Sequence, residues 1–439
     1  MHVSLSRTWI FVSLLLGISF ILHFWRIDIP NKPVFDENSF STYAADYTNK
    51  IAFFDIHPPL GKVVYAIPLF FTNKENLNNS DFLKQTKESI RASTLVTFNT
   101  FPYQLLRAIS ALFGLLLVSS VFFFLRSLTR NNTIALIGMF FMVFESALLL
   151  ETRLILLNGM FLAFGFLALG FLYKEKPNFT LTGIFLGLAL SIKLVAIVFL
   201  GPILFYFFSK RFSSSKKSFV YICLLSFFLF VFLWIFLSNI LLPTGERLAF
   251  YNSSSKESMF GIDTNNFFFS FQSLPTIKAF FIELSATVSG YTTGKFHVVQ
   301  SSWYLWPFMI VPFTYFHDTI IDLILLGNPF VWMLGTLSVI FSLCVLALKR
   351  FRIWVTGNIT KSVLLVGYFS SLLPFALLHR STFLYHYFPA LIFSICLAAV
   401  YIYEHFETLD TKRKKRVLAL VVGGVLLGFA FAAPFIYAF

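Results

Sequence analysis

Long apolar runs recur along the chain and constrain its fold more than any other feature. They are about 20 residues long, the length at which an α-helix crosses the hydrocarbon core of a bilayer. Of the 439 residues, 57% are hydrophobic and only 12% are charged, whereas a soluble domain carries about 25% charged residues. The sequence therefore predicts an all-α polytopic membrane protein.

We expect about 11 transmembrane helices and two long external loops within one integral membrane domain, residues 1–439. The first external loop covers residues 26–101 and the second covers residues 241–326. Residues 180–209 are interpreted as two short helices that are broken near Ser191-Ile192-Lys193. The other predicted helices cover about residues 8–25, 103–125, 133–150, 155–173, 219–240, 328–348, 361–378, 384–403 and 417–436.

Basic residues predict the orientation of these helices. The formal net charge is +14, which in a soluble protein would indicate a nucleic-acid partner. Here cytoplasmic loop bias and anionic lipid explain the charge, so we expect membrane lipid and no nucleic acid as a partner. With eleven spans, all of the basic clusters lie on one side of the membrane, and the positive-inside rule makes that side cytoplasmic. The clusters are Arg126/Arg130, Lys174/Lys176, Lys210–Lys217, Lys349–Arg352 and Lys412–Arg416.

An acidic pair, Asp36-Glu37, follows the first hydrophobic segment. In a mostly apolar chain, charged groups at a membrane face are the first candidates for chemistry. Burial and mutual repulsion can raise the pKa of one carboxyl group of such a pair. That carboxylate would suit a general base that removes a proton from a hydroxyl nucleophile. The alternative is an ordinary solvated start of a loop.

The same loop also contains the sequence His57-Pro58-Pro59-Leu60-Gly61-Lys62. Lys62 could pair with phosphate, and His57 could donate a hydrogen bond or bind a metal. The alternative is a Pro-Pro turn that caps an interfacial helix, and we expect His57 to shape the loop rather than to react. The sequence shows no strong set of metal ligands, so no cofactor is expected and a divalent metal stays an open alternative.

Four cations lie at or near the predicted outer ends of helices, against the positive-inside trend: Arg107, Arg153, Lys193 and Arg380. A shared anionic ligand would explain all four, and phosphate is the natural one. The alternative for any one of them is a side chain that snorkels to lipid phosphate.

Two further stretches combine polar groups with aromatic rings. One runs from His297 to Pro307 and includes Trp303 and Trp306, and the other surrounds Tyr385. Aromatic side chains at membrane interfaces commonly act as anchors, and they also stack on sugars. These residues are therefore candidates either for substrate binding or for anchoring.

Taken together, several motifs resemble one family, the protein O-mannosyltransferases. The most specific are the Phe35-Asp36-Glu37 motif and the stretch Phe54–Lys62. The weaker ones follow in the same order along the chain: Glu151-Thr152-Arg153, Ser191-Ile192-Lys193, Ser302–Pro307, Leu326–Trp332 and Phe383–Ala390.

The resemblance implies a fold of the GT-C glycosyltransferase type and a polyprenyl-phosphate sugar donor, typically of mannose. It implies a Ser or Thr hydroxyl on a translocated protein as acceptor. By the same resemblance Asp36 is the base with Glu37 beside it, while Arg107, Arg153 and Lys193, with Arg380, contact the donor phosphate. The second loop is too short for the MIR insertion of eukaryotic members. This indicates a prokaryotic-type member in a bacterial or archaeal cell membrane rather than in the endoplasmic reticulum.

The working hypothesis is therefore an inverting sugar transfer at the periplasmic or exterior face. One alternative is a related transferase that modifies lipid A or a cell-envelope polymer, such as an aminoarabinose transferase. A polyprenyl-lipid transporter is a more remote alternative, because a transporter should place ionisable residues at mid-membrane depth and show internal repeats.

Overall fold

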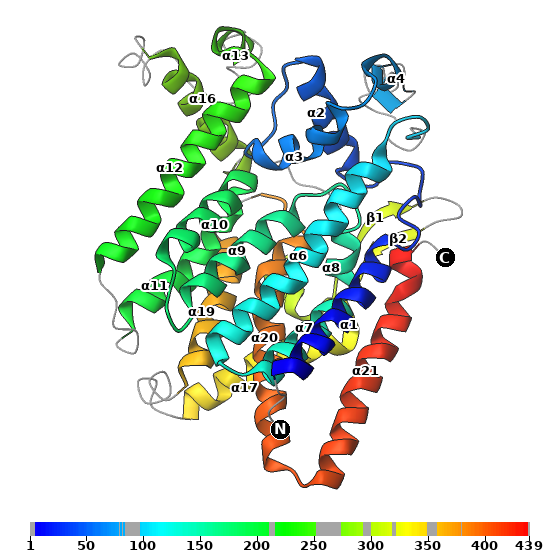
Figure 1. Cartoon of the computed structure of the whole chain (residues 1–439), viewed down its shortest axis with the longest axis vertical. Helices are drawn as coiled ribbons and strands as arrows, with labels where there is room; N and C mark the ends of the chain where they lie inside the picture. The colour runs from blue at the N-terminus through cyan, green and yellow to red at the C-terminus, as the bar shows by residue number, and fades with distance from the viewer. Residues whose placement is uncertain are drawn as a thin grey trace.

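Most of the chain forms long helices that lie side by side in an elongated bundle (Figure 1). In the computed structural model, seven of the described helices are long and apolar enough to cross a membrane. They confirm the predicted polytopic helical fold, while the number of crossings stays a prediction. The structure describes residues 5–78, 80, 82–83, 97–209, 216–251, 274–292, 300–317, 322–348, 358–378 and 380–437.

The seven long segments agree with predicted spans. They are α1 (Leu5–Phe24), α6 (Tyr103–Thr129), α12 (Lys216–Leu241), α17 (Pro329–Leu348), α19 (Ile359–Leu372) with η4 (Leu373–Leu377), η5 (Leu384–Tyr387) with α20 (Phe388–Thr408), and α21 (Thr411–Tyr437). Shorter apolar helices complete the bundle: α7 (Asn132–Val143), α8 (Ser146–Glu151), α9 (Asn158–Leu172), α10 (Phe179–Ile192), η1 (Leu194–Phe199) and α11 (Leu200–Phe208).

The segment predicted as one helix over 133–150 is divided into α7 and α8. The division occurs at Glu145, whose side chain caps α8 by accepting a hydrogen bond from the backbone N–H of Leu148 at 2.8 Å. The other carboxyl oxygen accepts from the backbone N–H of Asn328 at 3.0 Å. A capping carboxylate satisfies backbone donors that a helix start would leave unpaired, so it stabilises the break.

The predicted break near Lys193 is confirmed. Lys193 has an extended backbone, with φ −144° and ψ 132°, and separates α10 from η1. The break therefore puts a charged side chain where one apolar segment ends and the next begins.

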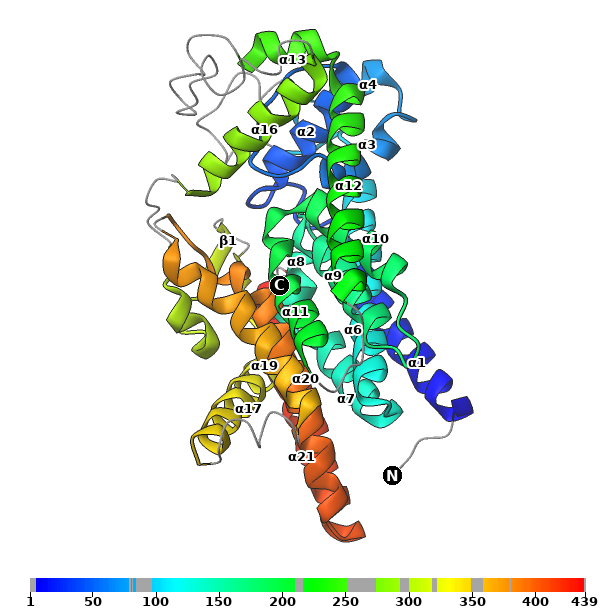
Figure 2. The same ribbon diagram turned by 90° about the vertical axis from the view of Figure 1, so that its left-hand side faces the viewer.

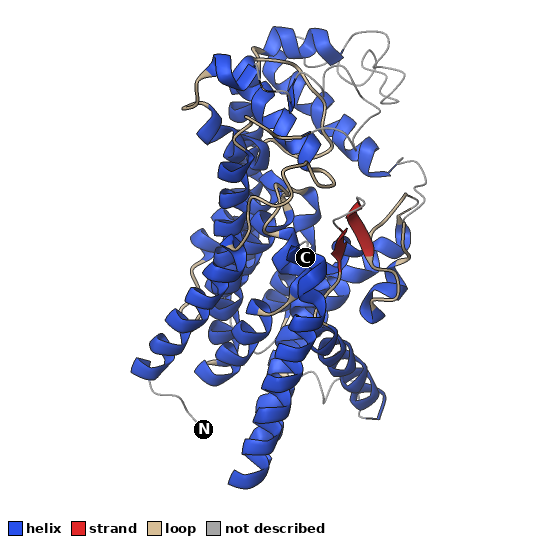
Figure 3. Cartoon of the chain, turned by 90° about the vertical axis from the view of Figure 1, so that its right-hand side faces the viewer, coloured by secondary structure: helices blue, strands red, loops and turns tan. Residues whose placement is uncertain are grey.

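The helices of the first predicted loop segment and the first two described helices of the second gather at one end of the bundle, drawn at the top in Figures 1 and 2. The first segment folds into α2 (Glu37–Asn49), α3 (Leu60–Leu69) and α4 (Lys74–Asn78). The second contains α13 (Thr244–Tyr251), α16 (Pro275–Thr292), η3 (Trp303–Phe308) and a two-stranded antiparallel hairpin of β1 (Phe313–His317) and β2 (Asp322–Leu325). The hairpin lies beside the bundle (Figure 3).

A continuous hydrophobic core runs through the bundle, and α20 lies within it, with an unbroken buried stretch from Phe388 to Val400. In contrast, α21 packs against α17, α8 and β2 but leaves most of its surface exposed. A helix that is apolar and mostly exposed faces lipid in a membrane protein.

Candidate active site

A cavity of about 290 Å³ lies toward the end of the bundle where the helices of the loop segments gather. We call it the Asp36 cavity. Its wall combines residues from the first loop, α9, the Lys193 break, β1 and the start of the α20 segment. The lining residues are Phe35, Asp36, Ile56, His57, Asn158, Phe161, Lys193, Val195, Phe313, Arg380, Phe383, Tyr385, His386 and Pro389.

Asp36 is the residue that precedes α2, and its side chain makes no capping hydrogen bond to that helix. The carboxyl group instead lines the cavity. Burial raises its pKa to about 6, against a lowering by the charge of Lys193 and with a smaller raising contribution from Asp55. A carboxylate with a pKa near the working pH is well suited to accept a proton.

Lys193 supplies one cation to the same cavity. Its ammonium group donates a hydrogen bond to Asn158 Oδ1 at 2.7 Å and lies 5.7 Å from the centre of the Tyr385 ring. The side chain is buried. A buried ammonium group in a cavity is a strong binding site for an anion, because few water molecules compete with the anion.

Arg380 supplies a second cation to the Asp36 cavity. It donates hydrogen bonds to the carbonyl oxygens of Ser381 and Gly290, each at 3.3 Å. Tyr385, beside it in the wall, stacks on His386 with ring centres 4.4 Å apart. The cavity thus brings together one carboxylate, two cations and an aromatic wall from segments more than 300 residues apart in the sequence.

A series of buried hydrogen bonds links the ammonium group of Lys193 to other side chains of the bundle and the hairpin. Asn158, which accepts from Lys193, donates to Glu151 Oε1 at 2.6 Å, and Tyr315 donates to Glu151 Oε2. The Tyr315 ring in turn stacks on Phe35, with ring centres 4.8 Å apart. Phe35 directly precedes Asp36, so this network joins the carboxylate side of the cavity to the cation side.

Sequence reasoning assigned no role to Glu151, Asn158 or Tyr315. Glu151 belongs to the Glu151-Thr152-Arg153 motif, which by itself gives this residue no role. The available signal was a polar residue at each end of a short break between apolar helices, where an unpaired carboxyl or amide group would be costly to bury. That signal does not identify the partners, which come from the break at Lys193 and from the hairpin.

Glu37 lies next to Asp36 in the chain but does not line the cavity. It is fully buried and forms a two-pronged ion pair with Arg107, with distances of 2.8 Å from Nε and 2.7 Å from Nη2. Its carboxyl oxygens also accept hydrogen bonds from the backbone N–H groups of Val34 and Ile155, both at 2.9 Å.

Arg107 donates further hydrogen bonds to carbonyl oxygens of the first loop, at Ile27, Pro30 and Lys32. Arg153 likewise donates to the carbonyl oxygens of Leu22 and Arg26 and lies 4.2 Å from the centre of the Tyr437 ring. Of the four cations predicted to share an anionic ligand, the structure therefore brings two, Lys193 and Arg380, into the Asp36 cavity, while Arg107 and Arg153 do not line it.

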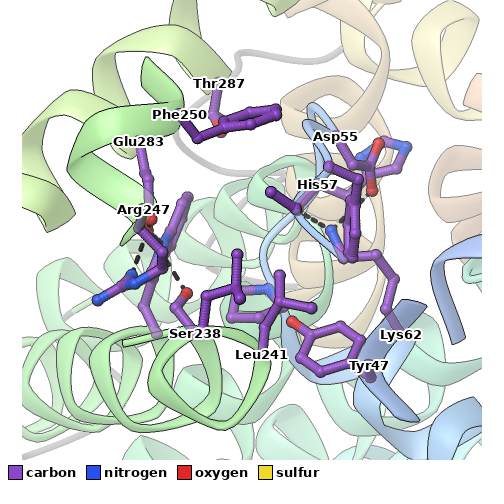
Figure 4. Close-up of a pocket in the computed structure, with 15 residues that line it drawn as sticks. Tyr47, Asp55, His57, Lys62, Ser238, Leu241, Arg247, Phe250, Glu283 and Thr287 are labelled. Carbon is purple, nitrogen blue, oxygen red and sulfur yellow. Dashed lines mark hydrogen bonds and ion pairs between the residues drawn. The ribbon is translucent and has the colours of Figure 1, made fainter. Parts of the chain in front are cut away.

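Lys62 faces a second, smaller cavity of about 50 Å³, drawn in Figure 4. Its ammonium group donates to Asp55 Oδ2 at 2.7 Å and to the carbonyl oxygen of His57. Across the cavity, Arg247 of α13 forms an ion pair with Glu283 of α16 at 2.7 Å. Each loop segment thus contributes one internal ion pair to the walls of this small cavity.

His57 lines both cavities. Burial, and after it the neighbouring charges of Lys193 and Lys62, hold its pKa well below the usual range. The expected role of His57 in shaping the loop stays a prediction.

The predicted aromatic residues have different surroundings. Trp306 is buried, and its indole N–H donates to Ser301 Oγ at 2.9 Å. Trp303 begins η3 and does not line either of the two cavities, whereas Tyr385 does line the Asp36 cavity. His297 lies outside the described residues.

Among the residues that the structure describes, no group of three or more His, Cys, Asp or Glu side chains is arranged to hold a metal ion.

Two family models match the chain. The model described as dolichyl-phosphate-mannose-protein mannosyltransferase matches residues 13–245. The model described as the C-terminal four-transmembrane region of protein O-mannosyltransferase matches residues 280–439. Together they include both long loop segments except for the residues between 245 and 280.

Among curated proteins, dolichyl-phosphate-mannose–protein mannosyltransferase 1 of Schizosaccharomyces pombe is 30% identical over 211 residues, which cover 45% of this chain and 22% of the relative. The corresponding enzyme 5 of Saccharomyces cerevisiae is 29% identical over 257 residues, or 53% of this chain and 33% of the relative. The aligned part of the chain therefore spans only about a fifth to a third of the length of these relatives.

Solved structures share the fold. The chain is similar to the S. cerevisiae protein O-mannosyltransferase Pmt1-Pmt2 complex bound to the sugar donor, with a TM-score of 0.80 at 17% identity, covering 100% of this chain and 91% of that chain. The chain is also similar to ArnT from Cupriavidus metallidurans bound to undecaprenyl phosphate, with a TM-score of 0.54 at 15% identity. This similarity covers 96% of this chain and 64% of that chain. The fold is thus that of a GT-C glycosyltransferase, and because the first family model covers more than half of the sequence, the chain belongs to the dolichyl-phosphate-mannose-protein mannosyltransferase family.

Proposed function

We propose that this protein transfers a mannosyl group from a polyprenyl-phosphate donor to the hydroxyl of a Ser or Thr residue in an acceptor protein. The observation that carries the proposal is the composition of the Asp36 cavity, where one carboxylate with a raised pKa faces the same space as Lys193 and Arg380. The names of the relatives supply the donor and acceptor classes.

In the proposed reaction, Asp36 accepts the proton of the acceptor hydroxyl. The hydroxyl oxygen then forms a bond to the anomeric carbon, on the face opposite the phosphate, while the bond from that carbon to the phosphate oxygen breaks. The electron pair of the broken bond goes to the lipid phosphate, whose negative charge increases. Lys193 and Arg380 stabilise this charge as it develops, as electrostatic catalysis requires. Inversion at the anomeric carbon follows from attack on the opposite face.

Glu151 is proposed as a positioning residue. By accepting from Asn158 and from Tyr315, it holds the amide that in turn holds the ammonium group of Lys193. A cation held by a chain of buried hydrogen bonds needs little reorganisation when the phosphate charge develops.

Glu37 and Arg107 are proposed to hold the first loop on the bundle rather than to contact substrate. Their ion pair, completed by backbone groups of the loop and by Ile155, satisfies both charged groups within the protein. The contacts of Arg153 with the end of α1 and with Tyr437 suggest a similar role at the neighbouring helix ends.

We infer that the Asp36 cavity opens at the exterior or periplasmic face of a bacterial or archaeal cell membrane. The cavity lies toward the end where the helices of both loop segments gather, and the basic segment that opens α21 lies at the other end (Figure 1). The positive-inside rule assigns that basic end to the cytoplasm.

The test is a transfer assay with the purified full chain, radiolabelled polyprenyl-phosphate mannose and a Ser/Thr-rich peptide. We expect label in the peptide, loss of transfer when each Ser and Thr is replaced by Ala, and an anomeric configuration in the product opposite to that of the donor by NMR. A parallel reaction replaces the peptide with lipid A, and label in the lipid with none in the peptide would assign the chain to the alternative transferase class. Retention of the donor's configuration would contradict the single-displacement mechanism.

A further inference from the structure

A second large cavity lies toward the other end of the bundle, away from the Asp36 cavity. It encloses about 650 Å³ and is bounded by four helices, α1, α7, α20 and α21. None of its lining residues belongs to the Asp36 cavity. We call it the α21 wedge, and its size lies within the range of about 300–1,000 Å³ typical of ligand pockets.

The wedge arises from the way α21 is attached. Tyr437, near the end of α21, donates a hydrogen bond to the carbonyl oxygen of Leu22 at 2.7 Å. Near its middle, the carbonyl oxygen of Val425 accepts from Asn328 Nδ2 at 2.9 Å. The first half of α21, from Thr411 to Val422, contributes to the wedge instead, and Figure 1 shows this half standing apart from α1 and α7.

The wall of the wedge is apolar on all four helices. Representative side chains are Leu15 of α1, Leu136 and Phe140 of α7, Ile402 of α20, and Leu418 and Val421 of α21. An apolar cavity between membrane-spanning helices is accessible to lipid hydrocarbon, because lipid tails are as apolar as these side chains.

The polar rim of the wedge carries two ammonium groups, on Lys414 and Lys415, and one carboxyl group, on Glu407 of α20. The two cations outnumber the single acidic group, so the rim has a net positive charge. Both belong to the basic segment Lys412–Arg416 that opens α21. The other basic residues of that segment do not line the wedge. Cations at the edge of an apolar cavity complement a ligand that has a hydrocarbon tail and an anionic head.

We propose that the α21 wedge binds one anionic phospholipid, with an acyl chain between α1 and α21 and the phosphate against Lys414 and Lys415. The lipid would fill the space that the divergence of α21 leaves open, and it would join α21 to the rest of the bundle. This site is separate from the proposed donor site, since its cations lie at the basic end of the bundle.

Native mass spectrometry of the purified full chain tests the proposal. The protein is equilibrated with phosphatidylglycerol or with phosphatidylcholine of the same acyl composition, and retained lipid is counted. We expect one phosphatidylglycerol to be retained in preference to phosphatidylcholine. Each lysine near a lipid phosphate contributes about 1 kcal/mol, so Lys414→Glu/Lys415→Glu should weaken retention at least about tenfold.

The matched control is Lys412→Glu/Arg416→Glu, which makes the same change of charge in the same helical turns but outside the wedge. It should retain phosphatidylglycerol as the unaltered chain does. A second variant, Leu136→Trp, fills the wedge without changing its charge and should also lose the lipid. Circular dichroism and the thermal midpoint of each variant show whether it is folded.

Several results would overturn the proposal. Equal loss in the two charge variants would show attraction by the basic surface as a whole. Equal retention of the two lipids, or retention that survives Leu136→Trp in a folded variant, would show that no specific site exists. A dimer that dissociates on Leu136→Trp, with no bound lipid, would identify a second copy of the chain as the occupant. None of these results depends on mannosyl transfer, which is measured separately.

Discussion

Asp36 and Glu37 are adjacent carboxylates with opposite environments. Asp36 lines a cavity that it shares with two cations, and its side chain makes no capping hydrogen bond to the helix that follows it. Glu37 is fully buried, and its two carboxyl oxygens accept four hydrogen bonds, two from Arg107 and two from the backbone. The carboxylate of Asp36 is therefore accessible from the cavity, whereas the carboxylate of Glu37 already has its hydrogen-bond partners within the protein.

The difference follows from their position at the start of a helix. Successive side chains of a helix point about 100° apart, so neighbours at its first turn face different surroundings. In the proposed mechanism the charged pair divides its tasks, since Asp36 reacts and Glu37 holds the loop that carries it. The same division separates Lys193 and Arg380 from Arg107 and Arg153.

The largest expected effect is on transfer. Asp36→Asn keeps the size of the side chain and removes the proposed base, so we expect kcat to fall by about 10²- to 10⁴-fold, the usual contribution of a general base. The thermal midpoint should stay close to that of the unaltered protein. Transfer at the original rate would show that Asp36 is not the base. A large loss of stability would show that Asp36, like Glu37, holds the fold together.

Arg107→Met should act on stability. It leaves the buried carboxylate of Glu37 without its charged partner, and breaking a buried ion pair in this way costs about 3–5 kcal/mol. Thermal unfolding in detergent measures the effect. The matched control is Arg380→Met, which removes a cation of the Asp36 cavity and should lower transfer with a much smaller change in the midpoint. If the two variants were equally stable, the proposed role of Arg107 in holding the loop would be wrong.

A smaller effect is expected from Glu151→Leu, which removes the acceptor for Asn158 and Tyr315. Misplacing the ammonium group of Lys193 should lower kcat about 10- to 100-fold with little change in KM. Glu151→Gln keeps an acceptor for Asn158 and should recover most of the loss. An equal defect in both variants would mean that the negative charge of Glu151, and not its hydrogen bonds, matters.

The dependence on pH gives the smallest effect. Burial raises the pKa of Asp36 to about 6, and the base acts only when ionised, so activity is full above that pH and declines as the pH falls through it. At pH 5, kcat/KM should be about tenfold below its plateau. Because the charge of Lys193 lowers this pKa, Lys193→Met should shift the decline toward higher pH. An unchanged profile in that variant would show that another group titrates.

Several features were predictable from the sequence because they depend on local patterns. Apolar runs of span length predict the membrane class and most helix positions, and the extended backbone at Lys193 confirms the predicted break. The segment over 133–150 was not predicted to be divided, because Glu145 caps a helix there while also bonding to Asn328, which is distant in sequence. Such a partner leaves no mark on local hydropathy.

By itself, the sequence determined that the chain is a helical membrane protein, and its motifs determined the family to which the chain belongs and the residues to consider first. The tertiary structure decided which of these residues face a common cavity. It paired Glu37 with Arg107, 70 residues away, and it placed Lys193 and Arg380 in the cavity beside Asp36. The physical reason is that hydropathy and helix propensity act over a few residues, whereas the direction of a charged side chain depends on partners that only the folded chain brings near.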